Sequence, residues 1–247
     1  MRLKITNNYS QNFSLPKRSK ALIKFIVLHY TGMRKESSAV YRLCNSKSKV
    51  SAHYFIKKNG VILQLVPDLY EAWHAGKSRW KEFKLLNKYS IGIEIQNTGH
   101  DYTFENYTSR QMSSLKKLLK SLFKIYKINY KHVLGHSDIS PDRKKDPGEK
   151  FPWEILSKKG LAFWHNLNKK MLKKNRLIKL SLNEKNEFLS ILQKIGYNKV
   201  NHIKTSQSNR YLTKSFQRRF RQDLVNGIID KECLLIIRNL DTKIKKS

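Results

Sequence analysis

The stretch from Val133 to Trp153 holds the residue types best suited to chemistry in this chain. His136 and Asp146 lie within it and offer an imidazole nitrogen and a carboxylate oxygen. These donors suit Zn²⁺, and a catalytic zinc site needs only three protein ligands and an open position for water. His29 is the candidate third ligand, because it ends an apolar run and the C-terminal mouth of a buried strand is rigid but reachable. The pattern predicts a His, His, Asp metal site.

Other donors leave the ligand set open at this point. The competing ligands, which spacing alone does not exclude, are His53, His74, Asp138 and Asp142. Nitrogen and oxygen ligands also suit divalent ions other than zinc. Glu94 and Lys144 are further charged residues that could take part in the chemistry. Each also has an ordinary interpretation: Glu94 as a strand carboxylate paired with a surface lysine, and Lys144 as a solvated loop cation.

Two apolar strands must position the chemistry. Residues 21–28 predict a buried strand that ends beside His29, and residues 90–97 predict another. In the second strand the isoleucines at 91, 93 and 95 share one face, so Glu94 faces the other way. A short strand over residues 132–135 then delivers His136.

Further elements complete an α/β domain. Residues 53–67 predict a hairpin that turns at Asn59 and Gly60. Residues 109–128 predict a long amphipathic helix that covers one face of the sheet. Shorter helices are expected after Glu36 and from about Leu161 to Met171.

From Leu182 onward the pattern is helical, with three short amphipathic segments. About 65 residues suffice for an independent domain. We therefore expect a mixed central β-sheet flanked by helices over residues 1–175, followed by a three-helix domain over residues 180–247. In the second helix Phe216 and Phe220 are expected in the core. The residues expected to point outward are Gln217, Arg218, Arg219 and Arg221.

Composition places the chain among globular proteins. Of its 247 residues 39% are hydrophobic, enough for a packed core. No run approaches the roughly 18 apolar residues of a membrane span, and residues 1–20 lack the apolar core of a signal peptide. Cys44 and Cys233 are far apart in sequence, so we expect free thiols.

The net charge of +33, from 51 Lys and Arg against 18 Asp and Glu, predicts attraction to polyanions. Nucleic acid, anionic lipid and carboxylate-bearing envelope polymers all qualify. The chain shows no pattern typical of RNA-recognition or zinc-finger modules. We therefore expect mostly solvated surface charge and no specific nucleic-acid partner.

Five motifs in this order resemble a known family. They are VLHYTG around His29, SAHYFIKKNGVILQLVPD, EAWHAGKSRW, SIGIEIQN and GHSDISPDRKKDPGEKFPW. Together they cover about residues 20–157 and resemble the zinc-dependent N-acetylmuramoyl-L-alanine amidases of the amidase-2 type. An aspartate at 146 resembles the AmpD and AmiD branch of that family.

The resemblance implies a role for each motif residue. His29, His136 and Asp146 would bind zinc, with Glu94 as general base and Lys144 as the cation that stabilises the oxyanion. The bond cleaved would join (anhydro-)N-acetylmuramic acid to L-alanine in peptidoglycan or muropeptides, during cell-wall turnover or recycling. The implied substrate-binding residues are Trp73, His74 and Asn87, with core packing as the alternative for Trp73. No ligand position is missing, which favours an active enzyme.

The C-terminal region resembles peptidoglycan-binding domain 1, through Gly196-Tyr197, Phe216-Gln217 and the turn from Gly227 to Asp230. An amidase followed by such a module resembles the AmiD type, which implies the periplasm or cell envelope, with a cytoplasmic recycling role as the alternative. Two other functions stay open at this point. One is a catalytically silent peptidoglycan-binding protein, and the other is a basic nucleic-acid-binding protein.

Overall fold

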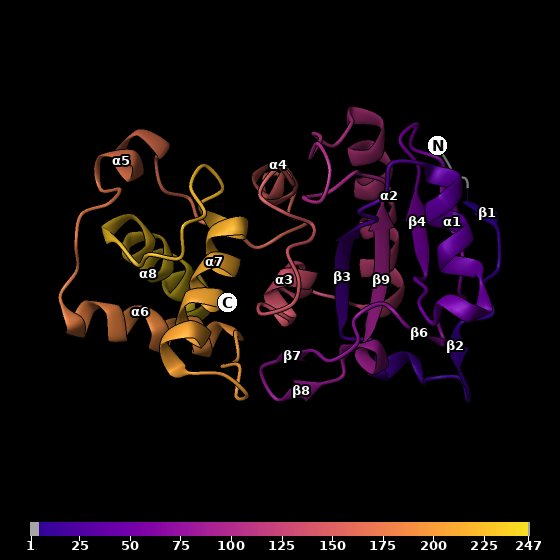
Figure 1. Cartoon of the computed structure of the whole chain (residues 1–247), viewed down its shortest axis with the longest axis horizontal. Coiled ribbons are helices and arrows are strands. Elements are labelled where there is room, and N and C mark those ends of the chain that lie inside the picture. Colours follow the sequence, from indigo (N-terminus) through magenta and orange to yellow (C-terminus); the bar gives the residue numbers. More distant parts are fainter. Residues whose placement is uncertain (1–4, 247) are drawn as a thin grey trace.

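Apolar, β-branched runs form a mixed six-stranded sheet flanked by helices, with a helical C-terminal region beside it (Figure 1). This confirms the expected fold class. The computed structural model describes residues 5–246; residues 1–4, which begin the N-terminal segment discussed above, and residue 247 lie outside the described residues. Within that range no helix combines the length and the apolar character needed to cross a membrane.

The sheet has the order β1-β5-β4-β9-β3-β10. Its strands are β1 (Ile5–Asn7), β5 (Ile62–Gln64), β4 (Tyr54–Ile56), β9 (Ser90–Ile95), β3 (Phe25–Tyr30) and β10 (Val133–Gly135). All neighbouring pairs are parallel except β4 and β5. Two small antiparallel pairs join β2 (Phe13–Ser14) to β6 (Glu71–Ala72) and β7 (Arg79–Trp80) to β8 (Phe83–Lys84). The central strands β3 and β9 therefore end together at one edge of the sheet.

The two faces of the sheet differ in chemistry. On one face Ile91, Ile93 and Ile95 are fully buried in the main core. On the other, His29 lies directly opposite Glu94 in the register of β3 and β9, so both side chains leave the same face. The expected direction of Glu94 is confirmed.

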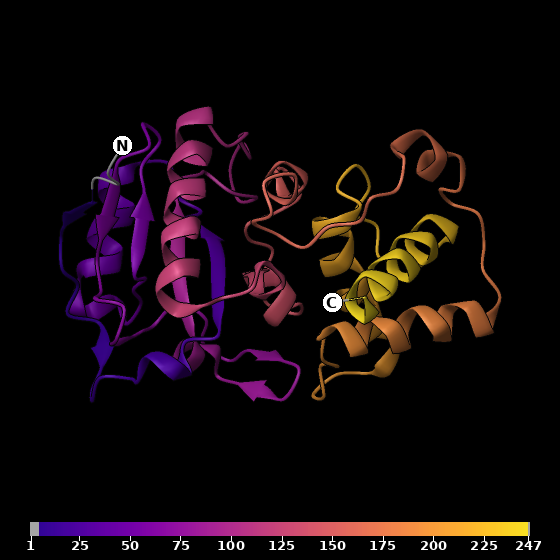
Figure 2. The ribbon, with the colours of Figure 1, turned by 180° about the vertical axis from the view of Figure 1, so that it is seen from behind.

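Helix α2 (Ser109–Tyr126) covers the apolar face, as Figure 2 shows from behind. Its first turn is closed by a capping box between Thr108 and Gln111. Met112, Leu115, Leu118, Leu119 and Leu122 form its buried stripe. Helix α1 (Glu36–Cys44) lies on the opposite face, where Ala39 and Leu43 join a smaller apolar cluster around Phe55. The face of the sheet that carries His29 and Glu94 is therefore covered only in part by α1, and the loops after β9 and β10 lie beside it.

The hairpin of β4 and β5 forms where Asn59 and Gly60 predicted it. The amide of Lys57 donates to Val61 O at 2.9 Å, and Gly60 has φ +87°. A Cβ on Gly60 would lie 2.8 Å from Arg110 O, at the start of α2. Glycine is needed there for both the turn and the helix contact.

Short elements connect these layers. They are the 3₁₀ turns Lys20–Leu22, Ser46–Ser48, Leu86–Tyr89 and Tyr130–His132, and the helices α3 (His136–Ile139) and α4 (Trp153–Ser157). Cys44 and Cys233 are both free, as expected.

The C-terminal region contains α5 (Lys169–Lys174), α6 (Leu182–Ile195), α7 (Thr205–Phe220) and α8 (Lys231–Lys245). The helix expected from Leu161 to Met171 is wrong: α5 begins only at Lys169. All five side chains from Leu161 to His165 are buried, which one face of a helix does not allow. The segment instead runs between the two halves of the molecule, where Trp164 packs on Phe220.

The helix α5 packs against α8 and lies with the C-terminal helices in Figure 1. The boundary expected between residues 175 and 180 therefore falls within this helical region. One continuous cluster of buried side chains also includes Ile26 of the sheet and Phe216 of α7. The two halves share a core, so the C-terminal helices are not a separately packed unit.

The expected outward direction of Gln217, Arg218, Arg219 and Arg221 is wrong for three of the four. Gln217, Arg219 and Arg221 are at most 3% exposed, whereas Arg218 is half-buried. The reason is that α7 is covered on two sides. Arg219 faces α3, where it donates to Asp138. Gln217 and Arg221 face the loop between α7 and α8, where they donate to Asn226 and Asp230. A helical pattern with one apolar stripe does not reveal these contacts.

Candidate metal centre

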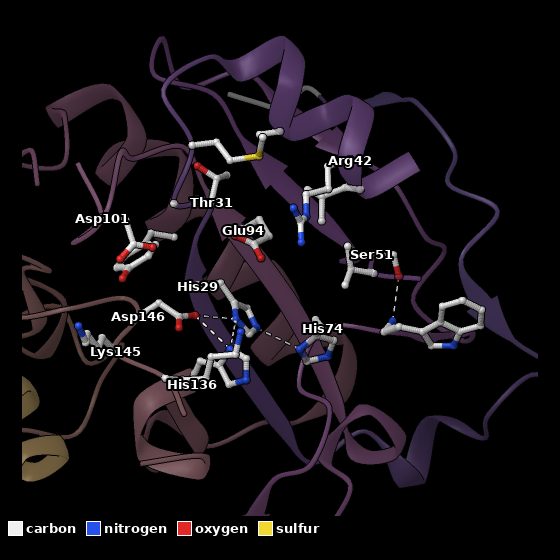
Figure 3. A pocket seen from close by; sticks show the side chains of 18 of the residues that line it. His29, Thr31, Arg42, Ser51, His74, Glu94, Asp101, His136, Lys145 and Asp146 are labelled. Carbon is white, nitrogen blue, oxygen red and sulfur yellow. Dashed lines mark hydrogen bonds and ion pairs between the residues drawn. The ribbon is translucent and has the colours of Figure 1, made fainter. Parts of the chain in front are cut away.

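Three ligand atoms converge above the ends of the central strands (Figure 3). His29 Nδ1 lies 2.9 Å from His136 Nδ1 and 2.9 Å from Asp146 Oδ2, and the last two atoms are 3.1 Å apart. The three residues are 1%, 3% and 6% exposed. Among the described residues this is the one set of three or more such donors that could hold a metal ion. The alternatives left open by the sequence do not form a comparable cluster there.

The charge states of these groups suit a cation. Burial lowers the pKa of His29 to about 4, so its imidazole is neutral at pH 7 and has a lone pair to offer. Burial alone would raise the pKa of Asp146, but its interactions with His136 and His29 outweigh burial and lower it. Two imidazoles and one carboxylate form the N, N, O donor set of catalytic zinc sites. The donor set therefore fits zinc.

Hydrogen bonds behind the site fix which nitrogen of each histidine is free. His136 Nε2 donates to Ala75 O at 3.1 Å, because a carbonyl only accepts. Its Nδ1 is then left with the lone pair that faces Asp146 and His29. A hydrogen bond to the nitrogen that does not face the metal determines both the tautomer and the orientation of a histidine ligand.

The tautomer of His29 is set through His74. The hydroxyl of Ser90 donates to Leu86 O at 2.6 Å, so its oxygen accepts from His74 Nε2 at 3.2 Å. His74 Nδ1 is then an acceptor, and His29 Nε2 donates to it at 3.0 Å. The lone pair of His29 Nδ1 therefore points into the centre. Burial, then the neighbouring His29, lowers the pKa of His74, which keeps it neutral in this chain.

Gly92 makes room for this arrangement. A Cβ at Gly92 would lie 2.4 Å from the ring of His74, closer than real Cβ contacts. Only glycine lets the ring of His74 lie across β9, between Ser90 and His29. The substrate-binding role expected of His74 stays a prediction, since the ring also lines the cavity beside its contact with His29.

Glu94 lies next to the centre with a free oxygen. Its Oε2 is inaccessible and has no hydrogen-bond partner among the described residues. Burial raises the pKa of Glu94 well above its usual range; Asp146 adds to this rise and Lys144 opposes it. A carboxyl with a raised pKa and an unused oxygen is suited to accept and return a proton.

The centre opens into a cavity of about 530 Å³. Its cationic lining residues are Arg42, Arg143, Lys144 and Lys145. Figure 3 shows Arg42 of α1 directed into the cavity across from Glu94. Lys144, expected from the sequence, lies in this lining, whereas no motif pointed to Arg42. An anionic substrate suits such a wall.

Two further predicted residues lie near the cavity in different ways. Trp73 lines it while its Nε1 donates to Ser14 Oγ at 2.8 Å. Asn87 is not among the described lining residues. Its Oδ1 accepts from the amides of His74 and Ala75 at 3.1 and 2.6 Å, so it holds the loop that carries these residues. Its geometry is that of a loop anchor, not of a substrate contact.

A family model described as N-acetylmuramoyl-L-alanine amidase matches residues 18–149, more than half of the chain. That range contains the three converging ligands, Glu94 and Lys144. The chain belongs to this amidase family.

Relatives extend the similarity beyond the amidase domain. The chain is 33% identical over 230 residues to the N-acetylmuramoyl-L-alanine amidase AmiD of Escherichia coli, covering 88% of this chain and 82% of that protein. The structure of AmiD from E. coli with anhydro-N-acetylmuramic acid-L-Ala-D-gamma-Glu-L-Lys matches with a TM-score of 0.79 and 30% identity, over 95% of this chain and 94% of that one. AmpDh3 from Pseudomonas aeruginosa with anhydromuramic pentapeptide matches with a TM-score of 0.78 and 30% identity, over 94% and 95%.

The residues that sequence reasoning missed in this amidase are mostly partners behind the ligands. Ser90 could have been found, because the alternation of β9 puts it on the face of Glu94. Arg42 carried no such signal, since a cation on an exposed helix is usually a solvated one. The contacts that the C-terminal helices make with the neighbours of His136 also had no signal in the pattern.

Proposed function

We propose that this amidase is a zinc-dependent hydrolase that cleaves the amide between the lactyl group of N-acetylmuramic acid, in its anhydro or intact form, and L-alanine. The observation that carries the proposal is the convergence of His29, His136 and Asp146 beside the unpartnered oxygen of Glu94. The alternative hypothesis, a catalytically silent peptidoglycan-binding protein, explains neither the complete ligand set nor the free carboxylate oxygen.

His29 Nδ1, His136 Nδ1 and Asp146 Oδ2 would hold the metal. When bound there, zinc supplies a Lewis acid that lowers the pKa of a water molecule and polarises the scissile carbonyl. Each histidine would bind through Nδ1 and is oriented by the hydrogen bond of its Nε2.

Glu94 moves the proton. Its carboxylate accepts a proton from the attacking water and delivers that proton to the leaving amine of L-alanine. Burial strengthens it as a base and favours its holding the proton between the two steps. Lys144 lies in the wall of the same cavity and would stabilise the negative charge that develops on the carbonyl oxygen.

The substrate class follows from the relatives and the cavity. Two solved relatives are complexes with anhydromuramyl peptides. The cationic lining described above suits the carboxylates of a stem peptide, and Trp73 would offer an apolar surface to the sugar or the peptide. Trp73 and His74 are therefore proposed as substrate-binding residues.

The test uses a defined anhydromuramyl tripeptide and mass spectrometry. Untreated protein is expected to release free peptide, chelated protein to release none, and zinc to restore release. An Asp146→Asn variant is expected to be inactive, while the matched control Asp142→Asn, in the same loop but outside the ligand set, stays active. Intact substrate with zinc-loaded protein, or activity that survives the chelator, contradicts the proposal.

We further propose that the enzyme acts in the periplasm or cell envelope, with the cytoplasm as the alternative, and that residues 180–247 bind peptidoglycan. The similarity to AmiD over both halves of the chain supports this arrangement. On α7 the exposed Arg210 is available for such a contact. Cell fractionation tests the location. Sedimentation with purified sacculi tests the binding, with Arg210→Ala expected to weaken it.

A further inference from the structure

The ligand His136 lies on a segment that the C-terminal helices hold. It follows β10 and begins α3, a helix of only four residues. So short a helix does not fix its own geometry, because helix nucleation is unfavourable. In Figure 1 this segment lies between the sheet and α7. External contacts must therefore fix its position.

Two side chains of α7 make direct contacts with the backbone on both sides of His136. Ser215 Oγ of α7 donates to Ser137 O at 2.6 Å. Arg219 Nη2 donates to Val133 O at 3.0 Å. The four bonded residues, Val133, Ser137, Ser215 and Arg219, are all buried, so no water competes for these bonds.

Asp138 links the remaining contacts. Its Oδ1 accepts from Tyr197 OH at 2.6 Å, and its Oδ2 accepts from Arg219 Nη1 at 2.5 Å and from Gly135 N at 2.8 Å. Asp138 is 1% exposed and Arg219 3% exposed. Both carboxylate oxygens are thus used, and one of their donors is the backbone directly before His136.

The same segment reaches a second ligand. Ser137 N donates to Asp146 O at 2.8 Å, which ties the backbone after His136 to the backbone of Asp146. The guanidinium of Arg219 also lies over the ring of Trp153, 4.2 Å from its centroid. Residues far apart in sequence therefore hold two of the three ligands through one short helix.

We infer that the C-terminal helices belong to the catalytic unit, and that Tyr197, Ser215 and Arg219 are positioning residues for the metal ligands His136 and Asp146. This rests on the metal site of the proposed function. It assigns to these helices a role that is independent of any binding to peptidoglycan.

Two conservative substitutions in the full-length chain test the inference. Tyr197→Phe removes the hydrogen bond to Asp138, and Ser215→Ala removes the one to Ser137. The matched controls are Tyr126→Phe, whose hydroxyl donates to Asp68 at 2.8 Å, and Thr213→Val, whose hydroxyl donates within α7. Each variant and its control lose the same kind of hydrogen bond, which lies near the metal centre in the variant and away from it in the control.

The readouts are the Zn²⁺ dissociation constant, by competition with a chromophoric chelator, the visible absorption spectrum of the Co²⁺ form, and Tm. Tyr197→Phe and Ser215→Ala are each expected to weaken Zn²⁺ binding about tenfold and to alter the Co²⁺ spectrum. The controls are expected to keep Zn²⁺ affinity within about twofold of wild type, although their Tm falls by a similar amount.

Equal Zn²⁺ affinity and unchanged Co²⁺ spectra in all four variants would overturn the inference, because lower Tm alone would mark a purely structural interface. In that case the wild type still binds metal and the proposed function stands. A wild-type protein that binds neither ion overturns both.

Discussion

Two carboxylates beside the metal centre are surrounded in opposite ways. Glu94 leaves one buried oxygen without a partner among the described residues, and burial raises its pKa. Asp138, by contrast, has both oxygens occupied by Tyr197, Arg219 and the Gly135 amide. Both are carboxylates close to the site, so residue type does not explain the difference.

The difference separates a reacting group from a positioning group. A buried oxygen without a partner lowers stability, but it remains available to accept a proton from the attacking water. A carboxylate with donors on both oxygens contributes to stability and to a specific geometry, and neither of its oxygens is free to act as a base. Each substitution below affects one member of this contrast.

The largest expected effect is on turnover after Glu94→Gln. The amide keeps the shape of the side chain but does not act as a base, so kcat is expected to fall about 10³-fold. Release of peptide from an anhydromuramyl substrate measures it. The control Glu105→Gln changes an exposed partner of Lys58 and is expected to keep kcat. Near wild-type turnover in Glu94→Gln would remove Glu94 from the mechanism.

The next effect is on stability after Arg219→Met. Asp138 would stay buried without its cation, which is expected to lower the free energy of unfolding by about 3 kcal/mol. Urea denaturation measures it. Arg238→Met breaks an exposed ion pair with Glu187 and is expected to cost less than about 1 kcal/mol. Equal losses in the two variants would contradict the contrast between buried and exposed pairs.

A smaller effect is expected from Lys144→Met. Loss of the cation in the cavity wall is expected to lower kcat about 10²-fold and to leave Tm nearly unchanged, because the side chain is only partly buried. Steady-state kinetics measure it. Lys145→Met, the exposed neighbour, serves as control. If both variants lose activity equally, the total positive charge of the cavity wall supports turnover, and the specific role of Lys144 at the oxyanion is contradicted.

The smallest effect extends the contrast to buried imidazoles. Burial lowers the pKa of His53 to about 3 and of His165 to about 4. As the pH falls, these histidines therefore take up protons in the unfolded chain before they do so in the folded one. Their contribution to stability is complete above pH 6.5 and is lost as the pH falls towards 4. At pH 5 each of the two histidines is expected to lower the free energy of unfolding by about 2 kcal/mol relative to pH 7.

Urea denaturation at pH 7 and pH 5 measures this loss. His165→Gln is expected to flatten the pH dependence, and His202→Gln, at an exposed position, serves as the control. Equal flattening in both variants would contradict the assignment to buried histidines.

The sequence predicted the parts of the fold that depend on local pattern. Alternation in β9 fixed the face of Glu94, the spacing of apolar residues predicted α2, and Asn59-Gly60 predicted the hairpin. The His29, His136 and Asp146 set came from donor chemistry and from motifs. The strand, helix and hairpin patterns are local, and the ligand set is carried by motifs, so the sequence reveals them without the tertiary structure.

What the sequence did not predict depends on contacts between distant segments. Arg219 and Arg221 were predicted on an exposed helix surface, because nothing in α7 indicates that α3 covers Arg219 or that Asp230 pairs with Arg221. The segment from Leu161 to His165 read as a helix, although it is buried on all sides between the two halves. His74 is a related case, since its place behind His29 depends on the absence of a side chain at Gly92.

The most direct test measures Zn²⁺ affinity and turnover together in Glu94→Gln and Tyr197→Phe. We predict that Glu94→Gln binds Zn²⁺ within about twofold of wild type but turns over about 10³-fold more slowly even at saturating metal. Tyr197→Phe is predicted to bind Zn²⁺ about tenfold more weakly and to recover most of its turnover when saturated. Loss of metal affinity in Glu94→Gln together with unchanged affinity in Tyr197→Phe would contradict the account.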